Sequence, residues 1–220
     1  MQPDRARATF RGLAAWTAAA VLIAGLLWQF PLVRLRSLDA PSGDPQAFDP
    51  VGFAERFWSD DLKPALADAR PIAAVVAAIK ADPAAACRSL GRSVGLSRSC
   101  LYLVRTTGTI AEVSRGQCLL AVDEPAGLTV ALSLGPVFGT AVRDLPGTID
   151  PAARADSRDL AAAATEINRL VQERVIAGLK SNVAPGQRIE CVACGQLQGS
   201  LPAGKPWKLI PLAVQPVEEP

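Results

Sequence analysis

The first strong hydrophobic pattern in the chain is an uncharged, mostly apolar run at residues 13–33. About 20 consecutive apolar residues span the hydrocarbon core of a bilayer as a helix. Trp16 and Trp28 stand near the two ends of the run, where indole rings favour the membrane interface. The pattern predicts that residues 1–36 hold a short N-terminal segment and a single transmembrane helix.

Residues 37–47 are rich in proline, serine, glycine and aspartate, which predicts a flexible linker. Apolar positions at helical spacing then predict three helices, near 50–62, 71–80 and 84–90. Asp49 and Asp82 each precede a proline, a pair typical of a helix N-cap and first helical residue. We expect residues 48–97 to form a small helical subdomain.

An aromatic stripe, formed by Phe53, Phe57 and Trp58, marks the first of these helices. Aromatic residues about one turn apart usually form a packing seam, so we expect this stripe to pack against the next helix in the chain. The alternative is a platform that stacks on a sugar ring.

Four short runs of strand composition follow, at 101–105, 109–113, 117–122 and 128–134, separated by turn residues. In the third run Cys118, Leu120 and Val122 share one face, and Leu119 and Ala121 share the other. Short strands with regular turn signals predict an antiparallel meander that closes into a small barrel.

A long amphipathic helix is predicted at about 157–181, capped by Asp156 or Ser157 and ending at Asn182. Its apolar stripe consists of Leu160, Ala164, Ile167, Val171, Val175 and Leu179. Two strands follow, at 187–194 and 207–214, and Pro211 marks the second as an edge strand or a bulge. The β-rich subdomain therefore covers residues 98–214, and residues 215–220 form a tail. The predicted fold class is α+β.

The candidate functional site is the stretch 135–144, which separates the strands from the long helix. Two glycines around a proline predict sharp bends there. It lacks the G-K-[ST] ending of a phosphate-binding loop, so a structural turn is the simpler interpretation. Arg143 and Asp144 are either an anion-recognising pair or an internal ion pair. The candidate ligand- or partner-binding residues are Gly135, Pro136, Phe138, Gly139, Thr140, Arg143 and Asp144.

Composition narrows the function classes. There is no histidine among the 220 residues, which removes Ser-His-Asp and Cys-His catalysis and most catalytic zinc sites. The first 36 residues hold five arginines and one aspartate, which leaves 18 basic and 20 acidic residues in the rest of the chain. Such a body lacks the clustered basic face that nucleic acids require. We expect no nucleic-acid partner, no metal, no other cofactor and, apart from a thiol alternative, no enzyme activity.

The charges around the apolar run also predict an orientation. Three arginines precede the run and two follow it, which favours a cytoplasmic N-terminus and a body in the periplasm. The alternatives are a cleaved signal peptide and a cytoplasmic body. No small-x-small cleavage pattern follows the run, and no cysteine lies nearby to carry a lipid. We therefore expect a retained single-pass anchor in the inner membrane.

Five cysteines are present, an odd number, so at least one is unpaired within the chain. Cys191 and Cys194 form a C-x-x-C motif, but a glycine follows it in place of the helix that lowers thiol pKa in redox enzymes. The possible disulfide cysteines are Cys87, Cys100, Cys191 and Cys194. A bridge between Cys87 and Cys100 would stabilise the fold by about 3 kcal/mol. A thiol-disulfide enzyme and a zinc site stay as alternatives.

A resemblance to a known family appears in several separated segments. They are Phe48-Asp49-Pro50, Gly91-Arg92, the G-P-V-F-G-T-A-V-R-D stretch at 135–144, Asn168, and the closing L-I-P-L-A-V at 209–214. Over about residues 48–214 the chain resembles the bacterial predicted periplasmic lipoproteins called domain of unknown function 2291. The resemblance implies an OB-like β-rich part and a gene neighbourhood with sugar ABC transporters, and it implies no assigned activity. The aromatic run that follows R-D in the family is replaced here by Thr148, Pro151 and Arg154.

These observations lead to one function with two alternatives. We expect a membrane-anchored periplasmic accessory or interaction domain, associated with a sugar ABC transporter. The alternatives are a module that binds a small sugar or anion around residues 135–144, and a thiol-disulfide protein that uses Cys191 and Cys194.

Overall fold

The computed structural model describes residues 48–94, 99–149 and 156–217. The predicted anchor at 13–33 and linker at 37–47 lie outside these residues. Contacts between residues divide the chain into Met1–Ala47 and one compact unit, Phe48–Pro220. Within the described ranges no helix is long and apolar enough to cross a membrane.

The helical elements lie in two groups along the chain. The first group comprises α2 (Pro50–Arg56), the π-helical turn η1 (Phe57–Leu62), α3 (Lys63–Ala65), the 3-10 turn η2 (Leu66–Asp68), α4 (Ile72–Ala81) and α5 (Pro83–Leu90). The second comprises α6 (Ala141–Asp144), α7 (Ser157–Val171), the π-helical turn η3 (Gln172–Ile176) and α8 (Ala177–Asn182). Carboxylates of Asp49, Asp82 and Asp156 accept hydrogen bonds from first-turn amides, so the three predicted N-caps are confirmed.

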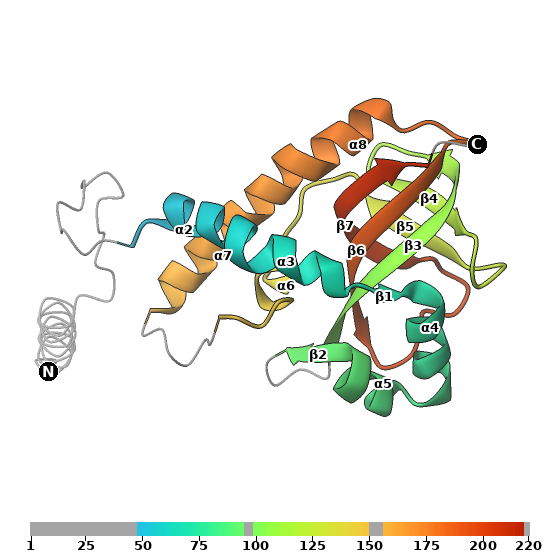
Figure 1. Cartoon of the computed structure of the whole chain (residues 1–220), viewed down its shortest axis with the longest axis horizontal. Helices are drawn as coiled ribbons and strands as arrows, with labels where there is room; N and C mark the ends of the chain where they lie inside the picture. The colour runs from blue at the N-terminus through green and yellow to red at the C-terminus, as the bar shows by residue number, and fades with distance from the viewer. Residues whose placement is uncertain (1–47, 95–98, 150–155, 218–220) are drawn as a thin grey trace, which may run out of the picture. The chain divides into compact units, whose positions relative to one another are not determined.

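The strands are β1 (Arg70–Pro71), β2 (Gly91–Val94), β3 (Ser99–Val113), β4 (Gln117–Val122), β5 (Thr129–Ser133), β6 (Arg188–Gln198) and β7 (Trp207–Pro216). Five of them pair in a closed circuit, β3-β4-β5-β7-β6 and back to β3 (Figure 1). The predicted α+β class is confirmed. The expected wholly antiparallel meander is wrong, because β5 and β7 pair in parallel over Val130–Leu132 and Trp207–Leu209.

The largest difference from the predicted strands concerns Gly108. The Thr107-Gly108 pair was expected to break a strand, yet β3 runs through it for 15 residues. A Cβ at Gly108 would meet the carbonyl oxygen of Ala121 on β4, so glycine allows two backbones to approach closely. A bulge between Ile110 and Glu112 then bends the strand.

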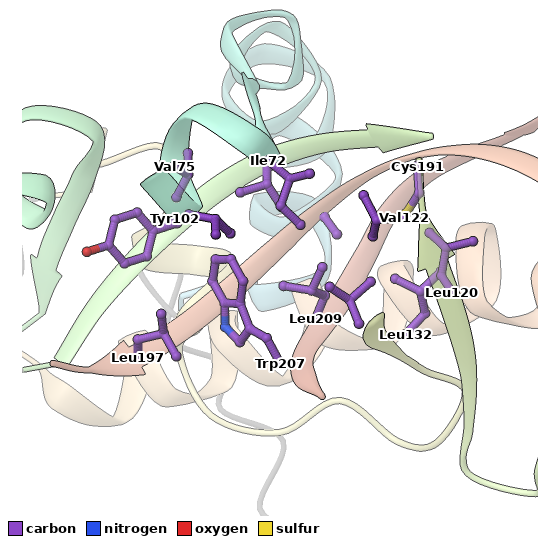
Figure 2. Close-up of a cluster of buried hydrophobic side chains, with 14 of the residues drawn as sticks. Ile72, Val75, Tyr102, Leu120, Val122, Leu132, Cys191, Leu197, Trp207 and Leu209 are labelled. Atoms are coloured by element: carbon purple, nitrogen blue, oxygen red, sulfur yellow. The ribbon is translucent and has the colours of Figure 1, made fainter. Parts of the chain in front are cut away.

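Side chains inside the strand circuit form the larger core. Cys118, Leu120 and Val122 point inward as predicted from their alternation. Trp207 packs edge-on against Tyr102 near Leu197 and Leu209, at the level where β7 faces β3 (Figure 2). Gly195 makes room for the indole, because a Cβ there would overlap the ring of Trp207.

The helices of residues 48–97 do not form a separate subdomain. Ile72, Val75, Val76 and Ile79 of α4 belong to the core inside the strand circuit, so α4 covers one end of it. Phe57 of η1 belongs instead to a second core with Ile167 and Leu170 of α7. The aromatic stripe therefore packs against the long helix and not against the next helix, which corrects the expectation.

The long helix runs from Ser157 to Asn182, as predicted within one residue. Its stripe is buried at Leu160, Ala164, Ile167, Val171 and Leu179. The expected Val175 is replaced by Ile176, which is fully buried. The π turn η3 explains the shift. Its hydrogen bonds join residues five apart instead of four, so one extra residue enters the turn and the buried face moves on by one position.

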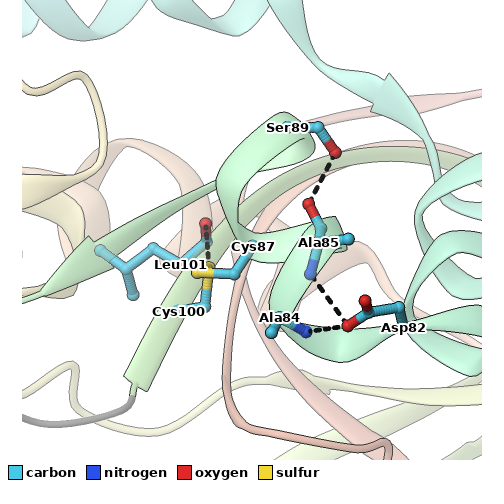
Figure 3. Close-up of a disulfide and its surroundings, with 7 residues drawn as sticks. All are labelled: Asp82, Ala84, Ala85, Cys87, Ser89, Cys100 and Leu101. Atoms are coloured by element: carbon cyan, nitrogen blue, oxygen red, sulfur yellow. Dashed lines mark hydrogen bonds between the residues drawn. A yellow bond between two sulfur atoms is a disulfide. The ribbon is translucent and has the colours of Figure 1, made fainter.

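A disulfide joins Cys87 at the end of α5 to Cys100 at the start of β3 (Figure 3). This is one of the pairings that the sequence leaves possible. Gly91 is needed next to it, because a Cβ there would lie 2.5 Å from Sγ of Cys100 and 2.9 Å from the ring of Tyr102.

Removing this bridge tests its contribution. Replacing Cys87 and Cys100 together by alanine should lower the free energy of unfolding by about 3 kcal/mol, because the unfolded chain regains the entropy of the loop. Guanidinium unfolding of the oxidised protein and the double variant gives the difference. The wild-type protein with reductant serves as control and should unfold at the same concentration as the variant. Equal midpoints for all three samples would contradict the prediction.

Candidate functional site

The loop that follows β5 displays the most exposed large apolar side chain among the described residues. Phe138 is 80 % exposed, whereas the neighbouring Val137 packs against the second core. Gly139 has a φ of +82°, which favours glycine and turns the chain towards α6. The predicted sharp bend is therefore present, and it points a phenylalanine into solvent.

Asn168 on α7 holds this loop in place. Its Nδ2 donates a 2.9 Å hydrogen bond to the carbonyl oxygen of Gly139, and the residue is only 7 % exposed. Asn168 lies four residues after Ala164 and three before Val171, so it occupies a position on the buried stripe of the helix. A polar residue on an apolar stripe was the signal that could have identified it as part of the site.

Two hollows flank Phe138. The groove between the loop and α7 has a volume of about 480 Å³ and is lined by Pro136–Thr140, Ala161, Ala164, Thr165, Asn168, Arg169, Gln172 and Glu173. We call it the α7 groove. The second hollow, of about 270 Å³, lies over the strands and includes Ser133, Gln196 and Lys208. Phe138 lines both hollows, so its ring would contact a ligand bound in either one.

Arg143 and Asp144 do not line the α7 groove. Nη2 of Arg143 lies 2.7 Å from Oδ1 of Asp144, and Nη1 donates a 3.0 Å hydrogen bond to the carbonyl of Leu160. Both side chains are largely buried. Of the two interpretations of this pair, the structure shows the internal ion pair, and the hydrogen bond from Arg143 to Leu160 connects α6 to α7. The candidate site keeps Pro136, Phe138, Gly139 and Thr140 on the groove, while Gly135 lies before its lining residues.

The chain matches the family described as predicted periplasmic lipoprotein, domain of unknown function 2291 (DUF2291), over residues 17–215. It belongs to this family. A solved OB-fold protein from Thermotoga maritima is similar over 78 % of this chain and 100 % of its own, with 22 % sequence identity and a TM-score of 0.68. That likeness shows the fold alone. A search of curated proteins finds no match.

Membership of the DUF2291 family places the protein in the periplasm. The family description also names a lipoprotein, and lipoproteins carry their lipid on a cysteine. The first cysteine in this sequence is Cys87, which is already bonded to Cys100.

The two cysteines of the C-x-x-C motif are not paired in this DUF2291 chain. Cys191 and Cys194 are free and buried, and they lie three residues apart on β6. Residues three apart on a strand point to opposite faces. Cys191 accordingly lies in the core inside the strand circuit and Cys194 in the second core.

Burial also makes these thiols poor nucleophiles. Burial raises the pKa of Cys194 to about 12 and that of Cys118 to about 11, and it raises the pKa of Cys191 as well. Thiolate is therefore scarce at neutral pH. Cys191 and Cys194 therefore do not form the possible disulfide, and their burial disfavours the thiol-disulfide alternative. Among the described residues no cluster of metal-ligating side chains is present.

A substitution distinguishes a structural Arg143 from a ligand-binding one. Arg143→Met should lower the free energy of unfolding by about 3 kcal/mol, because it leaves the largely buried Asp144 carboxylate without its partner. The matched control is Arg169→Met, which removes the solvent-screened pairs with Glu166 and Glu173 and should lower the free energy of unfolding far less. Denaturant unfolding measures both. Equal small losses for the two variants would show that the Arg143 pair does not hold the fold.

Proposed function

We propose that this protein is a membrane-anchored periplasmic interaction module that uses the Phe138 loop as its contact surface. The main support for this proposal is that Phe138 is 80 % exposed on a loop whose conformation is fixed by Asn168 and Gly139. Aromatic side chains held in a fixed position dominate the energetics of protein interfaces. The proposed partner is a component of a sugar ABC transporter, which the family resemblance implied.

Phe138 can be tested directly in cells. A photo-crosslinking residue at position 138 should give an adduct with one transporter component, identified by mass spectrometry. The same residue at Val51, which is 47 % exposed on α2, is the matched control and should give no such adduct. Phe138→Ala should weaken binding of the identified component about 30-fold, the loss expected for a hot-spot residue, and leave the unfolding midpoint unchanged. Equal adducts at positions 138 and 51 would refute this surface.

The anchor is the second part of the proposal. The apolar run at 13–33 supports retention by a transmembrane helix, and the absence of a cysteine before Cys87 argues against a lipid in its place. The alternative of a cleaved leader predicts a smaller, soluble mature protein.

Fractionation separates these alternatives. The full chain with a C-terminal alkaline phosphatase should be active, remain in membranes after carbonate washing, and keep its N-terminal residues by mass spectrometry. Substituting residues 1–36 by a cleavable signal peptide should release it into the soluble periplasm. Labelling of the wild-type chain by radioactive palmitate, or a mature chain that lacks residues 13–33, would overturn the proposed anchor.

A second candidate function is the binding of a small ligand in the α7 groove. The observation that favours it is the groove itself, whose volume of about 480 Å³ lies in the range of small-molecule sites. An anion is a poorer ligand for this loop, since the Arg143 guanidinium is already paired with Asp144.

A further inference from the structure

Asn168 lines the α7 groove, and its side-chain oxygen indicates the chemical class of ligand that the groove accepts. Because Nδ2 donates to the carbonyl of Gly139, the amide orientation is determined and Oδ1 faces away from that carbonyl. Oδ1 has no hydrogen-bond partner among the described residues. Among the described residues, Nε1 of Trp207 is the fully buried side-chain polar atom without a partner. Oδ1 of Asn168 therefore keeps some access to solvent, and Asn168 lines the α7 groove.

The rest of the lining carries no unpaired charge. Nη1 of Arg169 lies 2.7 Å from Glu173, and its Nε lies 2.6 Å from Glu166. An anionic ligand would therefore find no free positive charge in the groove, since two carboxylates already share the Arg169 guanidinium. The remaining polar groups are the hydroxyls of Thr140 and Thr165 and the amide of Gln172. The Thr165 hydroxyl donates to the carbonyl of Ala161, so towards a ligand it acts as an acceptor.

These groups can donate and accept hydrogen bonds without charge, and Phe138 adds an apolar ring surface beside them. An entirely apolar ligand would cover the Oδ1 of Asn168 and leave it unsatisfied, which costs about 1–3 kcal/mol. A hydroxyl-rich ring matches the lining, because its hydroxyls bond to amides and hydroxyls while its C–H face packs on an aromatic ring.

We infer that the α7 groove binds an uncharged saccharide, with Asn168 Oδ1 accepting a hydroxyl hydrogen bond and Phe138 stacking on the sugar ring. The inference rests on the small-ligand candidate of the proposed function and is independent of the protein partner at Phe138. It adds Thr165, Asn168 and Gln172 to the binding residues.

Ligand-observed saturation-transfer NMR tests it on the full chain in a detergent without a sugar headgroup. The probes are D-glucose, D-ribose, D-xylose and maltose, with inorganic phosphate and trialanine as alternative classes. At least one sugar should bind, and neither phosphate nor trialanine should. Thr165→Val with Gln172→Ala should weaken sugar binding at least tenfold. The matched control is Gln215→Ala, in the separate groove between α8 and β7, and should leave binding unchanged.

The outcomes are distinguishable from those of the protein-partner test. Absence of binding by all four sugars, preferential binding of phosphate or trialanine, or full binding by the Thr165 and Gln172 double variant would overturn the saccharide inference. The crosslink at position 138 needs neither Thr165 nor Gln172. If it persists in the double variant while no sugar binds, only the saccharide inference fails.

Discussion

The closing ladder between β3 and β6 is the interaction on which the other features depend. Residues 99–109 of β3 pair with residues 188–198 of β6, far away in the sequence, while the second half of β3 also pairs with β4. With β4 and β6 on either side of β3, the circuit closes where β7, the neighbour of β6, pairs with β5, the neighbour of β4. This last pair is parallel. A parallel junction needs a long crossover. The connection from β5 to β7, residues 134–206, supplies that crossover, and it contains the Phe138 loop, the long helix and β6.

Sequence reasoning succeeded where local interactions decide the structure. Residues within one turn or one strand determine the N-caps, the ends of α5 and of the long helix, and the alternation in β4. It failed at Gly108, whose local signal is a turn but whose reason is the backbone of Ala121 on another strand. It also missed the π turns, because five-residue spacings such as Phe57 to Leu62 do not match the helical period. The parallel junction depends on topology alone and leaves no local signal.

The candidate site shows the same division. The bend at Gly139 was predictable, since only a few residue types accept its φ. For Arg143 and Asp144 the sequence left two interpretations open, an anion site and an internal ion pair, because the same two residues occur in both. The opposite directions of Cys191 and Cys194 could have been derived once a strand was assigned there, since an odd spacing on a strand separates two side chains. Burial then explains how free thiols persist in an oxidising compartment, because it suppresses the thiolate that oxidants attack.

The exposure of Phe138 is a cost that the fold enforces. Full burial of a phenylalanine side chain is worth about 1.5–3 kcal/mol, and hollows lined in part by apolar groups lie on both sides of the ring. The ring stays out because Gly139 fixes the turn after it, Asn168 holds the carbonyl of that turn, and Val137 anchors the residue before it in the second core. A loop free to relax would recover part of the burial energy. Because the loop is held on both sides of Phe138, the fold forgoes this burial energy and keeps an exposed aromatic surface that a ligand or partner can cover.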